Sequence, residues 1–284
     1  MKKNLVRIFI LILLLIMLFL FYKEMSEYAV KRVKVDASNQ AFANVPQSFD
    51  QTTIVFFSDV HYNKFMDKER LLPFIETINQ LEPDIVFFGG DLYDHPSVIL
   101  PSNEIIEELT TMLKSIDAPL GKYAVLGNHD HESTKTVSIV RQTLENSGFE
   151  VLVNEQVKIY SSQLEYISVV GVDSQLFGDP DIEMAFKDHN PNDFAIVLSH
   201  TPDLVELLDP NNVDWQLSGH SHGGQVALPL IGPLYKVPYA EKYTKKQQTV
   251  NGIQLNVSNG VGTTRVDMRL FANPQIHYFT LVGQ

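Results

Sequence analysis

The sequence contains no cysteine and is short of basic residues. Without a thiol the chain cannot form disulfide scaffolds, thiolate zinc sites or a cysteine nucleophile, so any metal must be held by His, Asp, Glu or Asn. Its 22 Lys and Arg residues stand against 34 Asp and Glu residues. The resulting net charge of -12 disfavours electrostatic capture of a nucleic acid polymer or an anionic lipid surface, and we expect no nucleic acid partner.

Internal repeats, low-complexity tracts and a second-domain boundary are also missing from the sequence. The 284 residues are 44% hydrophobic and 20% charged, which is typical of one large globular domain with enough apolar mass for a substantial core. We assign residues 51–284 to this domain and residues 29–50 to a linker that includes a first strand near 29–35.

The N-terminus has the layout of an export or membrane signal, because three basic residues at positions 2, 3 and 7 precede an unbroken apolar run at 8–22. The run is short of the roughly 20 residues that span a bilayer, but Leu5 and Val6 extend it if the Arg7 side chain reaches the interface. No small-residue cleavage site follows, so we favour an uncleaved anchor over residues 1–28 rather than a removed signal peptide. The basic flank predicts a single-pass cell-membrane protein with its N-terminus inside and its domain outside, secretion being the less favoured outcome.

The rest of the chain alternates between strand-like and helix-like patterns. Apolar runs of strand length, each followed by Ser or Gly, occur at 53–57, 85–88, 123–126, 195–198 and 215–217. Helical spacing of apolar residues occurs at 68–80, 103–115 and 134–146. After Gln225 short segments at 253–257 and 276–282 suggest antiparallel strands. The order predicts an α/β fold, a four-layer α/β/β/α sandwich of two packed sheets with helices outside.

Clusters of metal-ligand side chains follow five of these predicted strands. They are Ser58-Asp59-Val60-His61, Gly89-Gly90-Asp91, Gly127-Asn128-His129-Asp130, Ser199-His200 and Gly219-His220-Ser221-His222. Ligands of open α/β sheets bind outside the carboxyl ends of the strands, so we expect a dinuclear metal site there. Alternate residues of an extended segment point the same way, which would let Asp59 with His61, and His220 with His222, present paired ligands.

In this order the clusters resemble the pattern of the calcineurin-like metallophosphoesterases, which runs Asp-x-His, Gly-Asp, Gly-Asn-His-Asp or Glu, a lone His, and Gly-His-x-His. The resemblance covers residues 53 to about 283. The segment from Gly219 onward, with Val257-Ser258-Asn259-Gly260-Val261-Gly262-Thr263, is most similar to the bacterial membrane-associated phosphodiesterase branch. One short motif would be weak, whereas five in order are specific.

The resemblance implies a role for each matching residue. The first metal would be held by Asp59, His61, Asp91 and His222, and the second by Asp91, Asn128, His200 and His220, so that Asp91 bridges. A hydroxide between the metals would attack phosphorus. His129 would protonate the leaving oxygen as a general acid, and Asp130 would orient its ring. Nitrogen and oxygen ligands without a thiolate favour manganese, iron or zinc as the two divalent ions.

Several further residues are candidates for substrate contact but could instead have a structural role. His95 and His131 lie close enough in sequence to contact substrate, or are ordinary surface histidines; in the resembling branch a tyrosine is common at position 131. Asp173 matches a recurring branch element or caps a turn. Arg265 and Arg269 would bind phosphate or pair with Asp267. Apolar residues in predicted loops would form a lipid-facing rim or pack into the core: Phe65, Met66, Leu176, Phe177, Leu228, Leu230, Ile231 and Leu234.

The function implied by the resemblance is a phosphodiesterase at the outer face of the cytoplasmic membrane, acting on a lipid, lipid-linked or nucleotide phosphoester. A phosphomonoesterase, a catalytically silent metal-binding docking scaffold and an adhesion protein with structural metals are the alternatives. The intact Asn128-His129-Asp130 disfavours the scaffold, because docking needs no general acid. Nothing in the sequence indicates an oligomeric state.

Overall fold

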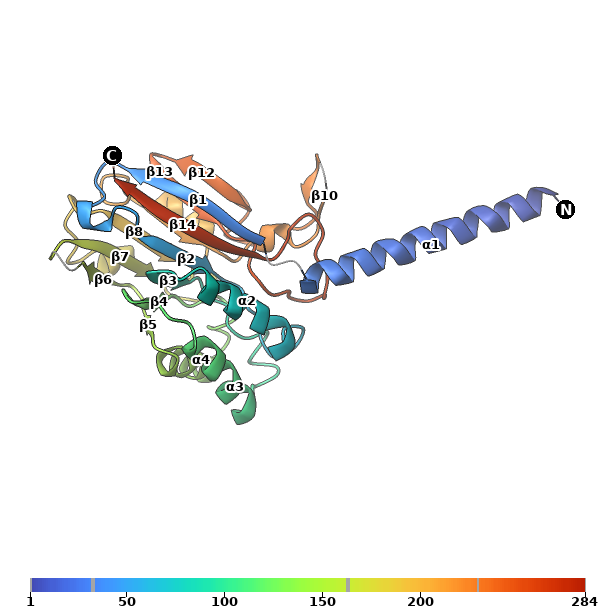
Figure 1. Ribbon diagram of the computed structural model, residues 1–284, viewed down its shortest axis with the longest axis horizontal. Helices are drawn as coiled ribbons and strands as arrows, with labels where there is room; N and C mark the ends of the chain where they lie inside the picture. Colours follow the sequence, from blue (N-terminus) through green and yellow to red (C-terminus); the bar gives the residue numbers. More distant parts are fainter. Residues whose placement is uncertain (1, 32–33, 162–163, 229, 284) are drawn as a thin grey trace.

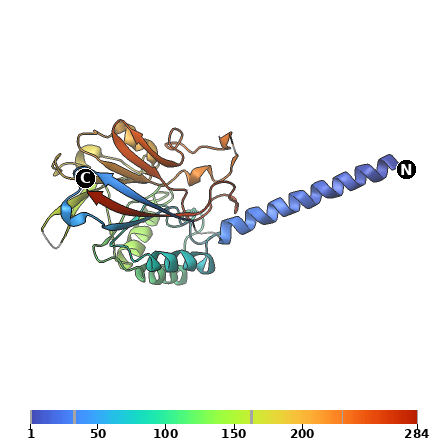
Figure 2. The ribbon, with the colours of Figure 1, turned by 45° about the horizontal axis from the view of Figure 1, so that its top comes forward.

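The computed structural model describes residues 2–31, 34–161, 164–228 and 230–283 and shows a layered domain from which one long helix projects (Figures 1 and 2). This helix, α1, is Lys2–Lys31, and its stretch Asn4–Phe21 is long and apolar enough to cross a membrane, with none of it buried. Because α1 continues to Lys31, the first strand starts at Lys34 and not near Ala29 as the sequence suggested.

The first sheet has the strand order β1-β14-β2-β3-β4-β5. β2 to β5 run parallel, whereas β14 is antiparallel to β2 and parallel to β1. The bounds are β1 Lys34–Phe42, β2 Thr53–Phe57, β3 Ile85–Phe88, β4 Lys122–Ala124, β5 Phe149–Val151 and β14 Gln275–Gly283.

The second sheet has the order β12-β13-β9-β8-β7-β6. Its four inner strands are parallel, and its two edge strands pair antiparallel with their neighbours. The antiparallel arrangement expected after Gln225 therefore holds for β12–β13 and β14–β2, while β13 and β14 also have parallel neighbours. The bounds are β6 Glu155–Tyr160, β7 Tyr166–Val172, β8 Ala195–Ser199, β9 Trp215–Ser218, β12 Lys246–Val250 and β13 Ile253–Val257.

Helices cover the outer face of each sheet. On the first sheet lie α2 Lys68–Gln80, α3 Asn103–Lys114 and α4 Thr134–Asn146 (Figure 1). The residue before each helix caps it: the side chains of Asp67, Ser102 and Ser133 each accept a hydrogen bond from a backbone N–H of the first turn. On the second sheet lie the short α5 Ile182–Ala185 and the 3-10 helix η2 Pro202–Leu207. Two more 3-10 turns are η1 Gln47–Phe49 and η3 His222–Gly224, and a small hairpin is formed by β10 Ala227–Leu228 and β11 Gly232–Pro233.

Three apolar clusters separate the four layers and confirm the predicted sandwich. Along β2, Val55 and Phe57 pack toward the helices, whereas Ile54 and Phe56 pack between the sheets against residues such as Trp215. A third cluster joins the second sheet to α5 and η2. Because β2 is buried on both faces, its sequence is a continuous apolar run rather than an alternating one.

The parallel strands of both sheets end at one edge, which we call the metal edge. The register places the start of β1 there as well: Lys34 pairs with Gln275, and β14 runs antiparallel to β2 with His277 opposite Phe56. Lys34 thus lies level with the carboxyl end of β2, only two strands away. The helix α1 consequently enters the domain at the metal edge.

Candidate metal centre

Two groups of ligand side chains converge at the metal edge. In the first, ligand atoms of Asp59, His61 and His222 lie within 4.8 Å of one another. The two Nε2 atoms of His61 and His222 are 3.1 Å apart, and His222 Nε2 lies 3.5 Å from Asp59 Oδ1. All three side chains are buried, so their nitrogen and oxygen atoms point at one small enclosed volume.

The second group contains Asp91, His200 and His220, whose ligand atoms satisfy the same 4.8 Å limit. Asp91 Oδ2 lies 3.2 Å from His200 Nε2 and 3.5 Å from His61 Nε2, which belongs to the first group. The carboxylate of Asp91 therefore lies between the two groups, where a bridging ligand would have to be.

Hydrogen bonds fix which nitrogen of each ring can face a metal. His200 Nδ1 donates to the Gly89 carbonyl oxygen over 2.7 Å, and His220 Nε2 donates to the Pro238 carbonyl oxygen over 2.8 Å. The other nitrogen of each ring is the one that can offer a lone pair to a metal when the ring is neutral. Within the described residues, His200 Nε2 and Asn128 Oδ1 are buried without a hydrogen-bond partner. Buried polar atoms are rarely left unsatisfied, so the donor set fits a divalent cation.

The electrostatics of the site suit the same ion. Burial and the neighbouring charge of His200 lower the pKa of His220 to about 3, and burial with His61 holds the pKa of His222 well below its usual value. Burial would raise the pKa of Asp91, but His200, His129 and His61 outweigh it and keep that pKa well below the ordinary range. Neutral His220 and His222 beside an ionised Asp91 are the protonation states that metal binding requires. For His200, burial is outweighed by the charges of Asp91 and Asp59, which raise its pKa to about 9, so this ring must release a proton when a metal binds.

The backbone that carries the ligands is not extended, contrary to the sequence expectation of alternating residues. Positive φ angles occur at Asp59 (54°), His61 (48°), Asp91 (60°), His220 (66°) and His222 (51°). Such angles are uncommon for residues with a Cβ and persist where surrounding structure enforces them. Here the backbone N–H of Asp59 donates to the Gly90 oxygen over 2.9 Å. The paired ligands meet because of these left-handed turns.

Two glycines make room for the carboxylates. A Cβ at Gly127 would lie 2.2 Å from Asp91 Oδ1, and one at Gly219 would lie 2.5 Å from Asp59 Oδ2. Any larger residue would displace the ligand, which explains why the motifs place glycine directly before Asn128 and His220.

The residue that contacts the His129 ring is Glu132 and not Asp130, so this part of the sequence interpretation was wrong. Both oxygens of Asp130 accept backbone N–H groups, Oδ2 from Asp91 and Gly127 over 2.8 Å and Oδ1 from Leu92 over 3.0 Å. Glu132 Oε1 lies 2.7 Å from His129 Nδ1. Asp130 therefore fixes the loops that carry the ligands, while Glu132 orients the ring.

The three predicted substrate-contact residues fall into two places. His95 joins the His129 group, since its Nδ1 lies 2.9 Å from Glu132 Oε1 and its ring packs edge-on against that of His129. His131 and Asp173 contact each other over 2.6 Å, and Asp173 also accepts the backbone N–H of Ser174, as a turn cap does. Whether these residues meet substrate stays a prediction.

The two C-terminal arginines, Arg265 and Arg269, lie in different surroundings. Arg269 is fully buried, donates to backbone carbonyl oxygens, Ala272 among them, and has its Nη2 atom 3.4 Å from His222 Nδ1, so its guanidinium contacts a candidate metal ligand. Asp267 pairs with Arg70 over 2.7 Å. Arg265 is left beside the metal centre. His277 lies buried in β14, as expected for a structural residue.

Glu132 and Asp94 are site residues that the sequence interpretation missed. Asp94 Oδ1 lies 3.3 Å from His61 Nδ1 and accepts a hydrogen bond from Thr264 Oγ1 over 3.0 Å, which holds the ring of a candidate ligand. Their only sequence signal is an acidic residue two or three positions after a motif, a spacing too common to single out.

Comparison with known proteins agrees with this geometry. A family model described as calcineurin-like phosphoesterase matches residues 52–224. The chain is 34% identical over 237 residues to an uncharacterized metallophosphoesterase, YkuE of Bacillus subtilis, covering 84% of this chain and 81% of the relative. It is 26% identical to phosphodiesterase YaeI of Escherichia coli, with 81% and 82% covered. It is 29% identical to UDP-2,3-diacylglucosamine pyrophosphatase LpxG of Chlamydia trachomatis, with 66% and 69% covered.

The match to the family model spans more than half of the chain and includes all five predicted motifs. The resemblance drawn from those motifs is confirmed. The chain belongs to the calcineurin-like phosphoesterase family, whose members bind divalent metals through Asp and His residues and hydrolyse phosphoesters.

Proposed function

We propose that this protein is a phosphodiesterase with two divalent metals that acts at the outer face of the cytoplasmic membrane on a lipid, lipid-linked or nucleotide phosphoester. The observation that carries the proposal is the pair of buried ligand groups with Asp91 between them. Structural metal sites are closed, whereas two adjoining groups that share one carboxylate leave positions for water and substrate.

The residues that would hold the metals are Asp59, His61, Asp91 and His222 for one ion and Asp91, Asn128, His200 and His220 for the other. Nitrogen and oxygen donors without thiolate favour manganese, iron or zinc. When bound, the ions would supply Lewis acidity that activates water and stabilises charge in an in-line displacement at phosphorus.

His129 is the residue that would deliver a proton to the leaving oxygen. Its Nδ1 donates to Glu132, which leaves Nε2 as the atom that carries the transferable proton. Burial lowers the pKa of His129, but the charges of Asp91 and Glu132 outweigh it and raise that pKa, so the protonated ring is favoured. The ring centroids of His129 and His61 are 5.0 Å apart, so the acid lies next to the first ligand group.

A diester preference is supported by the relative named phosphodiesterase, and an acylated substrate by the relative named UDP-2,3-diacylglucosamine pyrophosphatase. The net charge of -12 disfavours nucleic acid polymers as substrates. Retention of both His129 and its partner Glu132 disfavours the docking-scaffold alternative. A phosphomonoesterase is the second candidate, since no residue at the site excludes a terminal phosphate.

Membrane attachment rests on α1, with the apolar stretch Asn4–Phe21 as the span and the basic N-terminus inside. This arrangement would place the domain outside the cytoplasm.

The test is hydrolysis by the full-length protein in detergent of a chromogenic phosphodiester and its monoester counterpart, with added manganese and after chelation. Asp91→Ala is the loss variant, and Asp117→Ala, an exposed carboxylate before β4 at the opposite edge, is the matched control. Manganese-dependent diester turnover that Asp91→Ala alone abolishes supports the proposal. Equal or faster monoester turnover would overturn the diester assignment, and no turnover of either ester by metal-loaded protein would favour the scaffold.

A further inference from the structure

One small part of the domain exposes several large apolar side chains close together. They come from the β10–β11 hairpin, the residues after it and the loop at 262–272, and we call them the hairpin face: Leu230, Ile231, Leu234, Tyr235 and Val266. Each exposes more than half of its surface, and Leu234 exposes 61%. Water-exposed clusters of this kind mark contact surfaces for apolar partners.

The two segments of the hairpin face are fastened together. The backbone N–H of Ala227 donates to the Leu270 oxygen over 2.9 Å. The Gln225 side chain donates to the carbonyl oxygens of Thr264 and Val266 over 3.0 and 2.9 Å and accepts from the Thr264 N–H over 3.1 Å. Both polar atoms of the Gln225 amide therefore have backbone partners, so this side chain joins the two segments of the hairpin face.

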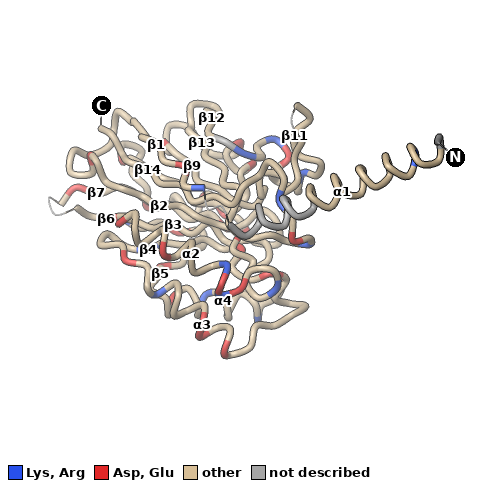
Figure 3. Tube along the Cα trace, turned by 45° about the vertical axis from the view of Figure 1, so that its right-hand side comes forward, with Lys and Arg blue, Asp and Glu red and all other residues tan. Residues whose placement is uncertain are grey.

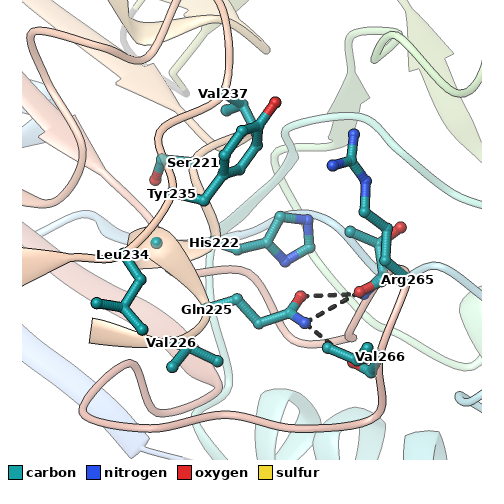
Figure 4. Close-up of a pocket in the computed structure, with 11 residues that line it drawn as sticks. Ser221, His222, Gln225, Val226, Leu234, Tyr235, Val237, Arg265 and Val266 are labelled. Atoms are coloured by element: carbon teal, nitrogen blue, oxygen red, sulfur yellow. Dashed lines mark hydrogen bonds between the residues drawn. The ribbon is translucent and has the colours of Figure 1, made fainter. Parts of the chain in front are cut away.

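Between these segments lies a cavity of about 270 Å³ (Figure 4). Its walls include Val226, Leu234, Tyr235, Val237 and Val266, and its lining also includes the candidate ligand His222. Figure 4 shows the His222 ring in the middle of this site with the aliphatic side chains around it. The cavity therefore adjoins the ring of one candidate ligand, which places an apolar site next to the metal centre.

One cation stands in the lining of the cavity. The Arg265 guanidinium lies over the Tyr235 ring, 5.3 Å from its centroid, and forms no ion pair with any residue of the described chain. A cation that is ordered by stacking and lacks an acidic partner is suited to a second anionic group of a ligand.

The topology directs this region toward the membrane. The start of β1 lies at the metal edge, three peptide steps after the end of α1 at Lys31. Lys31 lies ten positions along the helix from Phe21, the end of the apolar stretch, which is about 15 Å of helix. In Figures 1 and 3 the β10–β11 hairpin lies at the end of the domain from which α1 projects, and the apolar part of α1 carries no charged residue from 8 to 21.

We propose that the hairpin face and its cavity bind the hydrocarbon chain of a membrane lipid phosphoester whose phosphate lies at the metal centre. The inference rests on the phosphodiesterase proposed above and names its substrate class. Arg265 meets a further anionic or phosphate oxygen of the same headgroup. A cavity of this size lies near the lower end of small-molecule sites, roughly 300–1,000 Å³, so it takes one apolar segment while the rest of the lipid stays in the bilayer.

The test uses p-nitrophenyl phosphodiesters that share one leaving group and differ in a methyl or a hexadecyl second ester. The full-length protein is assayed in a fixed concentration of detergent, so that micelle partitioning of each ester is the same for all variants. The wild-type ratio of kcat/KM for the hexadecyl ester to that for the methyl ester is the reference value, because micelle partitioning contributes to it equally in every variant.

Leu234→Ser and Val266→Ser, from two separate segments, should each lower the ratio of hexadecyl to methyl kcat/KM by about tenfold. The matched control is Leu164→Ser, an apolar residue that is more exposed than either and lies in the β6–β7 turn, at the end of the molecule away from α1. Its ratio should equal that of the wild type. Two variants are used so that a folding defect in one leaves the other as the test.

The outcomes separate the two proposals. The same ratio in all four proteins, or an equal fall in Leu164→Ser, would overturn the chain-binding site while the metal-dependent turnover still stood. Absence of turnover of both esters by the metal-loaded wild type would instead overturn the phosphodiesterase, and the chain-binding site with it.

Discussion

The metal centre and the hairpin face lie side by side at one edge of the domain, and each reverses the usual distribution of side chains. At the metal centre, carboxylates and imidazoles are buried, whereas in the hairpin face leucine and isoleucine side chains are exposed. Burying charged groups and exposing large apolar ones are both unfavourable for an isolated chain. Each region thus points to a component outside the polypeptide, a cation in one case and lipid in the other.

The two regions also differ in how firmly they are built. Ligands of the metal centre are held by left-handed backbone, by glycines that leave no spare space and by hydrogen bonds such as His200 to Gly89. The hairpin face is held by the pairing of two strands of two residues each and by hydrogen bonds from the amide of Gln225. Reaction at phosphorus needs fixed positions, while contact with hydrocarbon tolerates variation.

The largest expected effect is a loss of activity that concerns the metal centre and not the hairpin face. Asp91→Ala removes the carboxylate shared by both ligand groups, so kcat/KM for a soluble diester should fall roughly a thousandfold or more. Steady-state assays with metal content measured on the same sample check this. Retention of activity within tenfold of the wild type would contradict the bridging position of Asp91. The fluorescence of a tryptophan placed in the hairpin face by Leu230→Trp should be the same with and without Asp91→Ala.

Metal removal should weaken folding at the metal centre. Ions that bind only the folded state stabilise it, and their loss by chelation should lower the melting temperature by about 5–10 °C, recovered on adding manganese. Differential scanning calorimetry of the wild type, with Asp91→Ala as the comparison, measures this. In the variant the chelator should have a much smaller effect; an equal shift in both proteins would show that the chelator acts elsewhere.

Glu132→Gln tests the residue that orients the general acid. Loss of the carboxylate beside His129 Nδ1 should lower kcat by roughly 10- to 100-fold. Glu132 helps raise the pKa of His129, so its neutralisation lowers that pKa. Since activity needs the protonated ring, the alkaline limb of the pH–rate profile should move to lower pH.

The matched control for Glu132→Gln is Glu145→Gln, an exposed carboxylate on α4. It should leave both kcat and the pH profile unchanged. A fall in kcat of Glu132→Gln without any displacement of the alkaline limb would mean that Glu132 supports the loop rather than the proton of His129.

The smallest effect is spectroscopic and concerns the hairpin face alone. The only tryptophan, Trp215, is buried between the sheets, so a tryptophan placed by Leu230→Trp reports separately on the hairpin. In lipid vesicles its emission should move to shorter wavelength and be quenched by brominated lipid. Leu164→Trp should show neither change. Equal quenching at both positions would remove the distinction between the hairpin face and the rest of the surface.

Much of the fold could be predicted because the inner strands are buried on both faces. The ranges of β2, β3, α2 and α4 agree with the sequence patterns, since continuous apolar runs and helical spacing are local signals. The start of β1 could not be placed, because α1 extends beyond its apolar stretch into a polar helical one. The choice between Asp130 and Glu132 also failed, because it depends on the backbone of a turn rather than on residue type.

By itself, the sequence determined the inventory and order of the ligands, because each motif directly follows a buried strand and the chemistry of its residues is intrinsic. Tertiary structure alone decided three matters. It set which carboxylate contacts the His129 ring. It brought the end of α1 to the metal edge, through the registers of β1 with β14 and of β14 with β2. It also joined residues 221–226 and 234–237 to 264–266 around the cavity beside His222, a contact between segments that meet in space only once both sheets have formed.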